Sequence, residues 1–148
     1  MCMMARDNRE AMPALDVLFY PSLPPDIFSK FFGECSEIHF LNEDEIMWFA
    51  NQYSKSVDSL INPYFSSLVA KDFSVSPPAI VITGEYDPLS DPAETFVKKL
   101  RRAGANAVGI RASGIIHGFA AGFKISYAAK NIVKMIYSII PDMMREQN

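Results

Sequence analysis

The stretch PPAIVITGEYDPLSD at residues 77–91 decides the fold of this chain. Its centre, Ala79–Thr83, is short, apolar nearly throughout and rich in β-branched side chains, and two prolines precede it. A run of this kind predicts a parallel strand that is covered on both faces. Gly84 ends the run and opens a loop that carries Asp87, so a carboxylate is expected just beyond the strand.

Further strands and helices alternate on either side of this strand. Acidic residues mark two of the helix starts, and Gly104 and Pro141 mark two of the helix ends. Strands that alternate with helices are typical of a parallel sheet with right-handed crossovers, so the fold class is α/β. The predicted elements are strands over Leu15–Tyr20 and Ala105–Arg111, and helices from Asn42 to about Tyr53, from Asp91 to Gly104 and from Ser126 to about Ile139.

Residues 22–76 separate the first two strands and are too many for a simple crossover. They carry a helix of their own and many loop residues, which indicates an insertion above the sheet. We expect one domain over residues 1–148, in which residues 22–76 form a cap-like insertion.

Composition and charge argue against several classes of protein. The 148 residues are 49% hydrophobic, and a net charge of −3 gives no electrostatic reason to expect nucleic acid as a partner. No stretch approaches the roughly 20 apolar residues that a membrane span needs, and residues 1–11 lack the apolar core of a signal peptide. The two cysteines, Cys2 and Cys35, have no CxxC partner and favour a reduced, cytoplasmic setting.

Two loops are expected at the carboxyl ends of strands, where α/β sheets gather their active sites. Residues 84–89 present Asp87, and residues 113–119 present His117. If the two strands are neighbours, Asp87 can accept the Nδ1 proton of His117 and leave Nε2 free to act as a base toward a hydroxyl group. The same residues also fit a simpler interpretation, in which His117 is structural and Asp87 is a turn residue before proline.

Several ordered motifs resemble the hormone-sensitive-lipase-like α/β-hydrolases. Residues 77–91 are similar to the acid segment of that family, which reads approximately LPPALVITAEYDPLRDE, and residues 116–119 are similar to its HGF segment. Residues 18–21, 62–72 and 96–104 resemble its LIYP, NPYxSPL-A-DL and YAxxLRxAG stretches.

This resemblance implies the C-terminal part of an α/β-hydrolase fold, with parallel strands, flanking helices and a cap-like insertion. It implies that Asp87 is the acid and His117 the general base of a catalytic triad, and that the substrate is a small acyl ester. It also implies that Trp48 and Tyr53 belong to cap helices over the acyl pocket, although such residues serve equally well in plain core packing.

The sequence contains neither a G-x-S-x-G nucleophile motif nor an HGGG-type oxyanion loop. By resemblance, residues 5–10 match the end of the helix that follows the nucleophile. We therefore expect a truncated carboxylic-ester hydrolase that is a very poor esterase as an isolated chain. The alternative is a non-catalytic remnant that serves as an interaction or ligand-binding module.

The predicted strand Leu15–Tyr20 would leave an apolar sheet edge unpaired if no nucleophile strand lies beside it. We therefore expect a homodimer, aggregation or a complementary N-terminal chain at this edge. No cofactor is expected, because no glycine-rich phosphate loop is present. His39 and Glu43 have a spacing that could suit a metal, but no third ligand is evident, so no metal is expected either.

Overall fold

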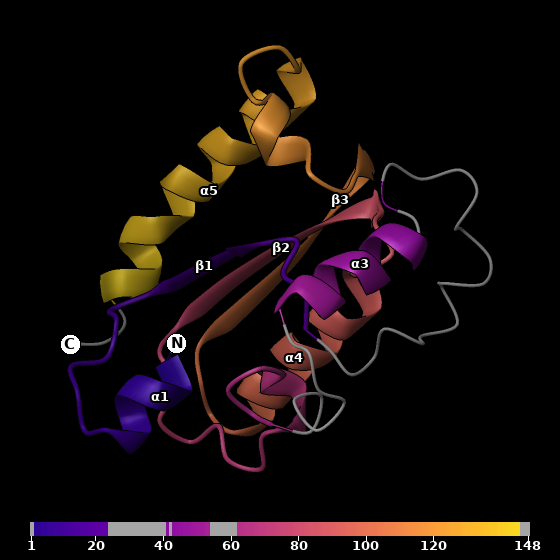
Figure 1. The fold of residues 1–148 in the computed structure, drawn as a ribbon. Coiled ribbons are helices and arrows are strands. Elements are labelled where there is room, and N and C mark those ends of the chain that lie inside the picture. The colour runs from indigo at the N-terminus through magenta and orange to yellow at the C-terminus, as the bar shows by residue number, and fades with distance from the viewer. Residues whose placement is uncertain (1, 24–40, 42, 54–61, 146–148) are drawn as a thin grey trace.

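The computed structural model of the chain describes residues 2–23, 41, 43–53 and 62–145. Within these residues, three strands form one sheet in the order β1-β2-β3, and both neighbouring pairs are parallel. Figure 1 shows β2 between the other two strands. The predicted α/β class with a parallel sheet is therefore confirmed. The bounds of the strands are Asp16–Phe19 for β1, Ala79–Tyr86 for β2 and Ala107–Ile116 for β3.

Helices cover both faces of the sheet. α4 (Ser90–Arg102) lies on one face and α5 (Tyr127–Arg145) on the other (Figure 1). Successive side chains of a strand point to opposite faces, and β2 uses both sets for the core. Ala79 and Val81 pack in the cluster on the α4 face, whereas Ile80 and Ile82 pack in the cluster on the α5 face. The prediction of a strand that is covered on both faces is confirmed.

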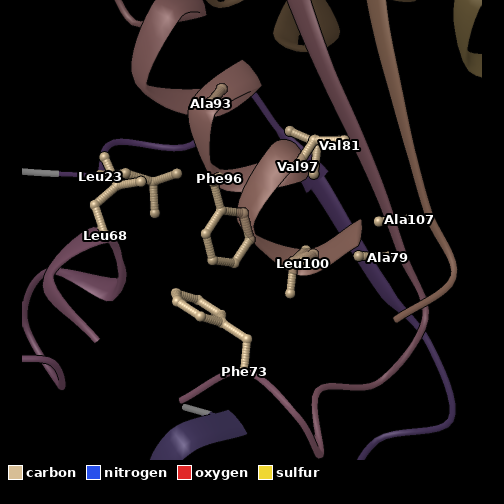
Figure 2. Packing of buried hydrophobic residues seen from close by; sticks show 10 residues of the cluster. All are labelled: Leu23, Leu68, Phe73, Ala79, Val81, Ala93, Phe96, Val97, Leu100 and Ala107. Carbon is tan, nitrogen blue, oxygen red and sulfur yellow. The ribbon is translucent and has the colours of Figure 1, made fainter. Parts of the chain in front are cut away.

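The core on the α4 face depends on one stripe of that helix. Figure 2 shows Phe96 of α4 beside Phe73 from the segment before β2, and the ring centroids lie 5.9 Å apart in an edge-to-face arrangement. Each large apolar side chain in such a cluster contributes about 1.5–3 kcal/mol through its burial. The buried members are Leu23, Leu68, Phe73, Ala79, Val81, Ala93, Phe96, Val97, Leu100 and Ala107.

β2 and β3 run further than the sequence predicted. β2 continues to Tyr86 and β3 to Ile116, so parts of the two expected loops are strand. Glycine suggested a loop at residues 84 and 114, but both positions lie inside the strands. In the other direction, β3 begins two residues later than predicted, because the Ala105 N–H still bonds to the last turn of α4.

The helices follow the predicted positions, with one clear correction. α3 (Glu43–Tyr53) lies where it was expected, and α4 is followed by Gly104 with a φ of 88°, as a glycine after a helix end commonly shows. Pro141, however, does not end α5, which continues to Arg145. An interior proline removes one helix hydrogen bond. Here the added turn buries Met143 against the sheet, and this burial offsets the loss.

The connection between β1 and β2 passes through the predicted cap-like insertion. Its described parts include α3 and a short 3-10 helix, η3 (Ser67–Val69). The bounds of the insertion at residues 22 and 76 stay a prediction. At the start of the chain, α1 (Cys2–Asp7) is held by a hydrogen bond from Arg6 to the Asp72 carbonyl at 2.9 Å. Among the described helices, none has the length and apolar character to cross a membrane.

Candidate active site

The acid and the histidine follow directly after the last paired residues of β2 and β3. Tyr86 pairs with Ile116, and Asp87 and His117 come next on their strands. His117 Nδ1 lies 3.0 Å from Asp87 Oδ1. The two side chains that the sequence placed on neighbouring strand ends are therefore in hydrogen-bonding contact.

Asp87 is fully buried, and Oδ1 of its carboxylate has two partners, whereas Oδ2 has none among the described residues. Oδ1 also accepts the backbone N–H of Leu89 at 2.9 Å, and the Asp87 carbonyl accepts the N–H of Ser90, the first residue of α4. An ionised carboxylate can only accept hydrogen bonds, so it fixes the imidazole proton on Nδ1. The Nε2 atom of His117 is then the ring nitrogen that can take up a proton.

Tyr20 forms a wall beside the imidazole, although no local sequence pattern singles it out. It follows β1 with a φ of 38°, and its N–H bonds to the Ile82 carbonyl at 2.6 Å. Its ring lies edge-to-face on His117, with centroids 4.7 Å apart, and on Phe119 at 5.5 Å. Burial, and then the charge of Asp87, raise the pKa of Tyr20, so its hydroxyl stays protonated at neutral pH.

A cavity of about 430 Å³ opens beside His117. Its wall is largely apolar and combines the end of β1 with α3, and Ile46 of α3 packs on Leu89 next to the acid. Such a cavity, with a polar group at one side, is the usual form of a small-molecule site. Residues that line it include Tyr20, Ile46, Phe49, Tyr53, Phe65 and His117.

The structure separates the two aromatic residues that were predicted to contact substrate. Tyr53 lines the cavity, and its ring lies 5.1 Å from that of Phe65. Trp48 is 57% exposed on α3, packs against Phe49 and does not line the cavity. Substrate contact by either residue stays a prediction.

Other candidate groups do not gather at this site. Among the described residues, no set of three His, Cys, Asp or Glu side chains could hold a metal ion. The proposed spacing of His39 and Glu43 lies outside what the structure describes, because His39 and the Glu43 side chain are not among the described parts. Ser113 has a structural partner, since its hydroxyl donates to Glu85 at 2.8 Å. Ser22 lines the same cavity as His117 but has no flanking glycines.

Comparison with curated proteins identifies relatives of the chain. An arylesterase of Saccharolobus solfataricus is 31% identical over 144 residues, which are 97% of this chain and 46% of that protein. The carboxylic ester hydrolase LipN of Mycobacterium tuberculosis is 33% identical over 124 residues, which are 80% of this chain and 33% of LipN. The chain thus spans about half or less of the length of these relatives.

Comparison with solved structures also finds proteins of which this chain spans about half. The iron-lacking apo form of ESTFA superposes with a TM-score of 0.88 at 58% identity, over 96% of this chain and 46% of ESTFA. A hyperthermophilic esterase from the archaeon Pyrobaculum calidifontis superposes with a TM-score of 0.85 at 35% identity, over 96% of this chain and 47% of that esterase. The family model of the alpha/beta hydrolase fold matches residues 1–121. The chain therefore belongs to the alpha/beta hydrolase fold family, as its resemblance to hormone-sensitive-lipase-like esterases predicted.

Proposed function

We propose that this chain supplies the acid and the general base of a carboxylic-ester hydrolase that acts on small acyl esters. The observation that carries the proposal is the 3.0 Å contact between His117 Nδ1 and the buried carboxylate of Asp87. The cavity beside His117 has the volume of a small-molecule site. Several relatives are named as esterases, which supports ester hydrolysis for the whole protein.

The proposed reaction uses His117 twice. In the first half, Nε2 takes the proton of a serine hydroxyl as its oxygen attacks the acyl carbon, and Asp87 stabilises the positive imidazolium. The same proton then passes to the departing alkoxide, which leaves as the alcohol while the acyl group stays on the serine oxygen. In the second half, Nε2 takes a proton from water as the water oxygen attacks the acyl carbon. The bond to the serine oxygen then breaks, the serine oxygen takes this proton, and the carboxylic acid product leaves.

The serine of this reaction is proposed to come from outside these 148 residues, because they contain no G-x-S-x-G motif. A further part of the same protein or a separate chain would carry it, together with the oxyanion donors. On its own the chain should be a very poor esterase, since loss of the triad nucleophile costs on the order of 10⁶ in turnover.

We also propose that the outer edge of β1 receives a strand from a complementary segment or from a second copy of the chain. Within the described residues β1 pairs with β2 alone, and its four residues are half-buried. An unpaired apolar edge readily pairs with another strand. Light scattering of the isolated chain tests this, and a stable monomer at high concentration would contradict it.

We also propose a cytoplasmic location. Cys2 is free, and its thiol donates to Asp16 Oδ2 at 3.0 Å, which fits a reducing compartment. Cell fractionation tests this, and recovery from an oxidising compartment would contradict it.

A chimera tests ester hydrolysis most directly. Residues 1–148 replace the matching part of the Pyrobaculum calidifontis esterase, and hydrolysis of p-nitrophenyl butyrate is measured. We expect activity in the chimera, a loss of about 10³-fold or more in His117→Ala, and little change in Ser22→Ala. A folded but inactive chimera would contradict the proposal and favour a non-catalytic, ligand-binding role for the cavity.

A further inference from the structure

The two strands that carry the acid and the histidine do not keep one register to their ends. Gly84 pairs with Ala112, but two residues further along β2, Tyr86 pairs with Ile116, which is four residues further along β3. β3 therefore holds two more residues than β2 at this point. Extra residues in one strand of a pair form a β-bulge, and bulges often aim a side chain at a functional site.

This bulge decides which residue lies beside Asp87. If the register of the earlier pairs continued, Ile115 would lie beside Asp87. His117 would then lie two residues further along the strand, so its backbone would be displaced by about 6.6 Å from the position level with Asp87. The two extra residues bring His117 level with Asp87. The bulge also changes the face to which the side chains of β3 point: Ala107 packs in the cluster on the α4 face, whereas Ile115 packs in the cluster on the α5 face.

The carboxylate of Glu85 holds the bulge in place. Glu85 Oε2 accepts the backbone N–H of Gly114 at 2.7 Å and the hydroxyl of Ser113 at 2.8 Å. Gly114 has a φ of 70°, which glycine adopts without strain. These bonds, with that of Gly114 first, lower the pKa of Glu85, so the carboxylate is charged at neutral pH and its hydrogen bonds are charge-assisted.

The base of the bulge is closely packed as well. A Cβ atom at Gly84 would collide with the Ile115 carbonyl, which is backbone and cannot swing aside. The strand ends therefore approach each other as closely as a glycine allows. Two contacts therefore hold the bulge: Gly84 packs against the Ile115 carbonyl, and the next residue, Glu85, accepts hydrogen bonds from Ser113 and Gly114.

We propose that Glu85 is a positioning residue, which locks the bulge at Ser113 and Gly114 and so sets His117 at hydrogen-bonding distance from Asp87. Glu85 does not line the cavity and acts through the histidine. Its effect on the contact between His117 and Asp87 is a property of the fold, whereas its effect on ester hydrolysis rests on the proposed function.

The Nδ1 proton of His117 provides a test that needs no catalysis. His39→Gln leaves His117 as the single histidine of the 148-residue chain. In this ¹⁵N-labelled parent, NMR measures how fast the Nδ1 proton exchanges with water. We expect exchange about tenfold faster in Glu85→Ala, which is the factor that a lost hydrogen bond to a charged group provides. Glu85→Gln should fall between the two, because its amide oxygen can still accept from Gly114.

Matched variants make the outcome specific. Ser113→Ala removes one of the two bonds and should give a smaller acceleration than Glu85→Ala. Glu94 of α4 binds Arg111, which lies on β3 like Ser113, at 2.8 Å. Glu94→Gln neutralises this carboxylate and should leave the exchange rate of the Nδ1 proton unchanged. Exchange at the parent rate in Glu85→Ala, or equal acceleration in Glu94→Gln, overturns the proposal. If circular dichroism shows that Glu85→Ala does not fold, parent rates in both Glu85→Gln and Ser113→Ala overturn it.

Kinetics in the chimera give a second readout. Glu85→Ala should lower kcat by about 10- to 100-fold, since misplacement of a reacting group by about 1 Å has that effect. KM should stay within about twofold, because no contact with bound substrate is lost. An inactive parent chimera contradicts ester hydrolysis, whereas unchanged proton exchange contradicts positioning, so the two failures are distinguishable.

Discussion

The boundary between β2 and β3 differs sharply from the outer edge of β1. β2 is buried from Ala79 through Gly84 and pairs with β3 from Ala79 to Gly84 and again at Tyr86. β1 pairs along four positions, from Asp16 to Phe19, and all four are half-buried. The boundary holds the acid and the histidine together, whereas the edge contributes Tyr20 at its end and offers a surface for a further strand. The contact between Asp87 and His117 thus depends on the pair of strands β2 and β3, both of which lie within the described residues.

The largest effect is expected at Asp87, on the boundary between β2 and β3. In the chimera, Asp87→Asn should lower kcat by about 10⁴-fold, because the amide no longer fixes the Nδ1 tautomer or stabilises the imidazolium. Steady-state hydrolysis of p-nitrophenyl butyrate measures the loss. The matched control is Glu94→Gln, which neutralises a carboxylate on α4 away from the cavity. Equal losses of kcat in the two variants would contradict a specific role of Asp87.

A pair of core substitutions compares the stability of the two regions. Ile82 is fully buried at the centre of the sheet, so Ile82→Ala should lower the free energy of unfolding by about 3 kcal/mol. Leu18 of β1 is half-buried, so Leu18→Ala should cost about 1 kcal/mol. Urea unfolding measures both. If Leu18→Ala lowers the free energy of unfolding of the isolated chain by clearly more than this expected value, the edge of β1 is already covered, as in a dimer.

Substitution of two glycines with positive φ distinguishes the cost of backbone strain from an effect on the position of His117. Gly114 in the bulge and Gly104 after α4 have φ values of 70° and 88°, and no atom lies within 4 Å of a Cβ at either position. Alanine at either position should therefore lower the free energy of unfolding by about 1 kcal/mol. Gly114→Ala should also accelerate exchange of the His117 Nδ1 proton, and Gly104→Ala should not. Identical behaviour of the two variants would contradict this distinction.

The smallest effect concerns pH. The hydrogen bonds to Glu85 lower its pKa below the ordinary value of 4.5, so the folded chain holds the carboxylate charged more firmly than the unfolded chain does. Its stabilising effect is therefore full above about pH 4.5 and is lost as the pH falls through the lowered pKa. The stability difference between the parent and Glu85→Gln should shrink from pH 7 to pH 3. A difference that grows toward acid would contradict the assignment.

Sequence reasoning found the sheet and the contact between the acid and the histidine because both depend on short-range patterns. A continuous apolar run reports burial on both faces, and the carboxyl ends of parallel strands lie at one edge of the sheet. The adjacency of Asp87 and His117 followed from these two facts and from the resemblance of residues 77–91 to a known family. The roles of the two residues in catalysis stay a prediction.

Features that depend on packing between segments were missed. Gly84 and Gly114 suggested loops, yet one permits the close approach of two strands and the other a bulge. Pro141 suggested a helix end, but burial of Met143 two residues later favours the continuation of α5 to Arg145. Tyr20 was passed over because a wall against the imidazole is a property of three-dimensional contact. No local pattern records such contacts.

The left-handed backbone of Tyr20 sets a limit on how far this site can be stabilised. Non-glycine residues adopt a φ of 38° at a cost of about 1 kcal/mol or more, and such a cost persists where the surroundings require it. Glycine or asparagine would relieve the backbone but remove the ring that packs on His117 and Phe119. Any substitution that relieves the backbone at this position therefore also removes packing around His117.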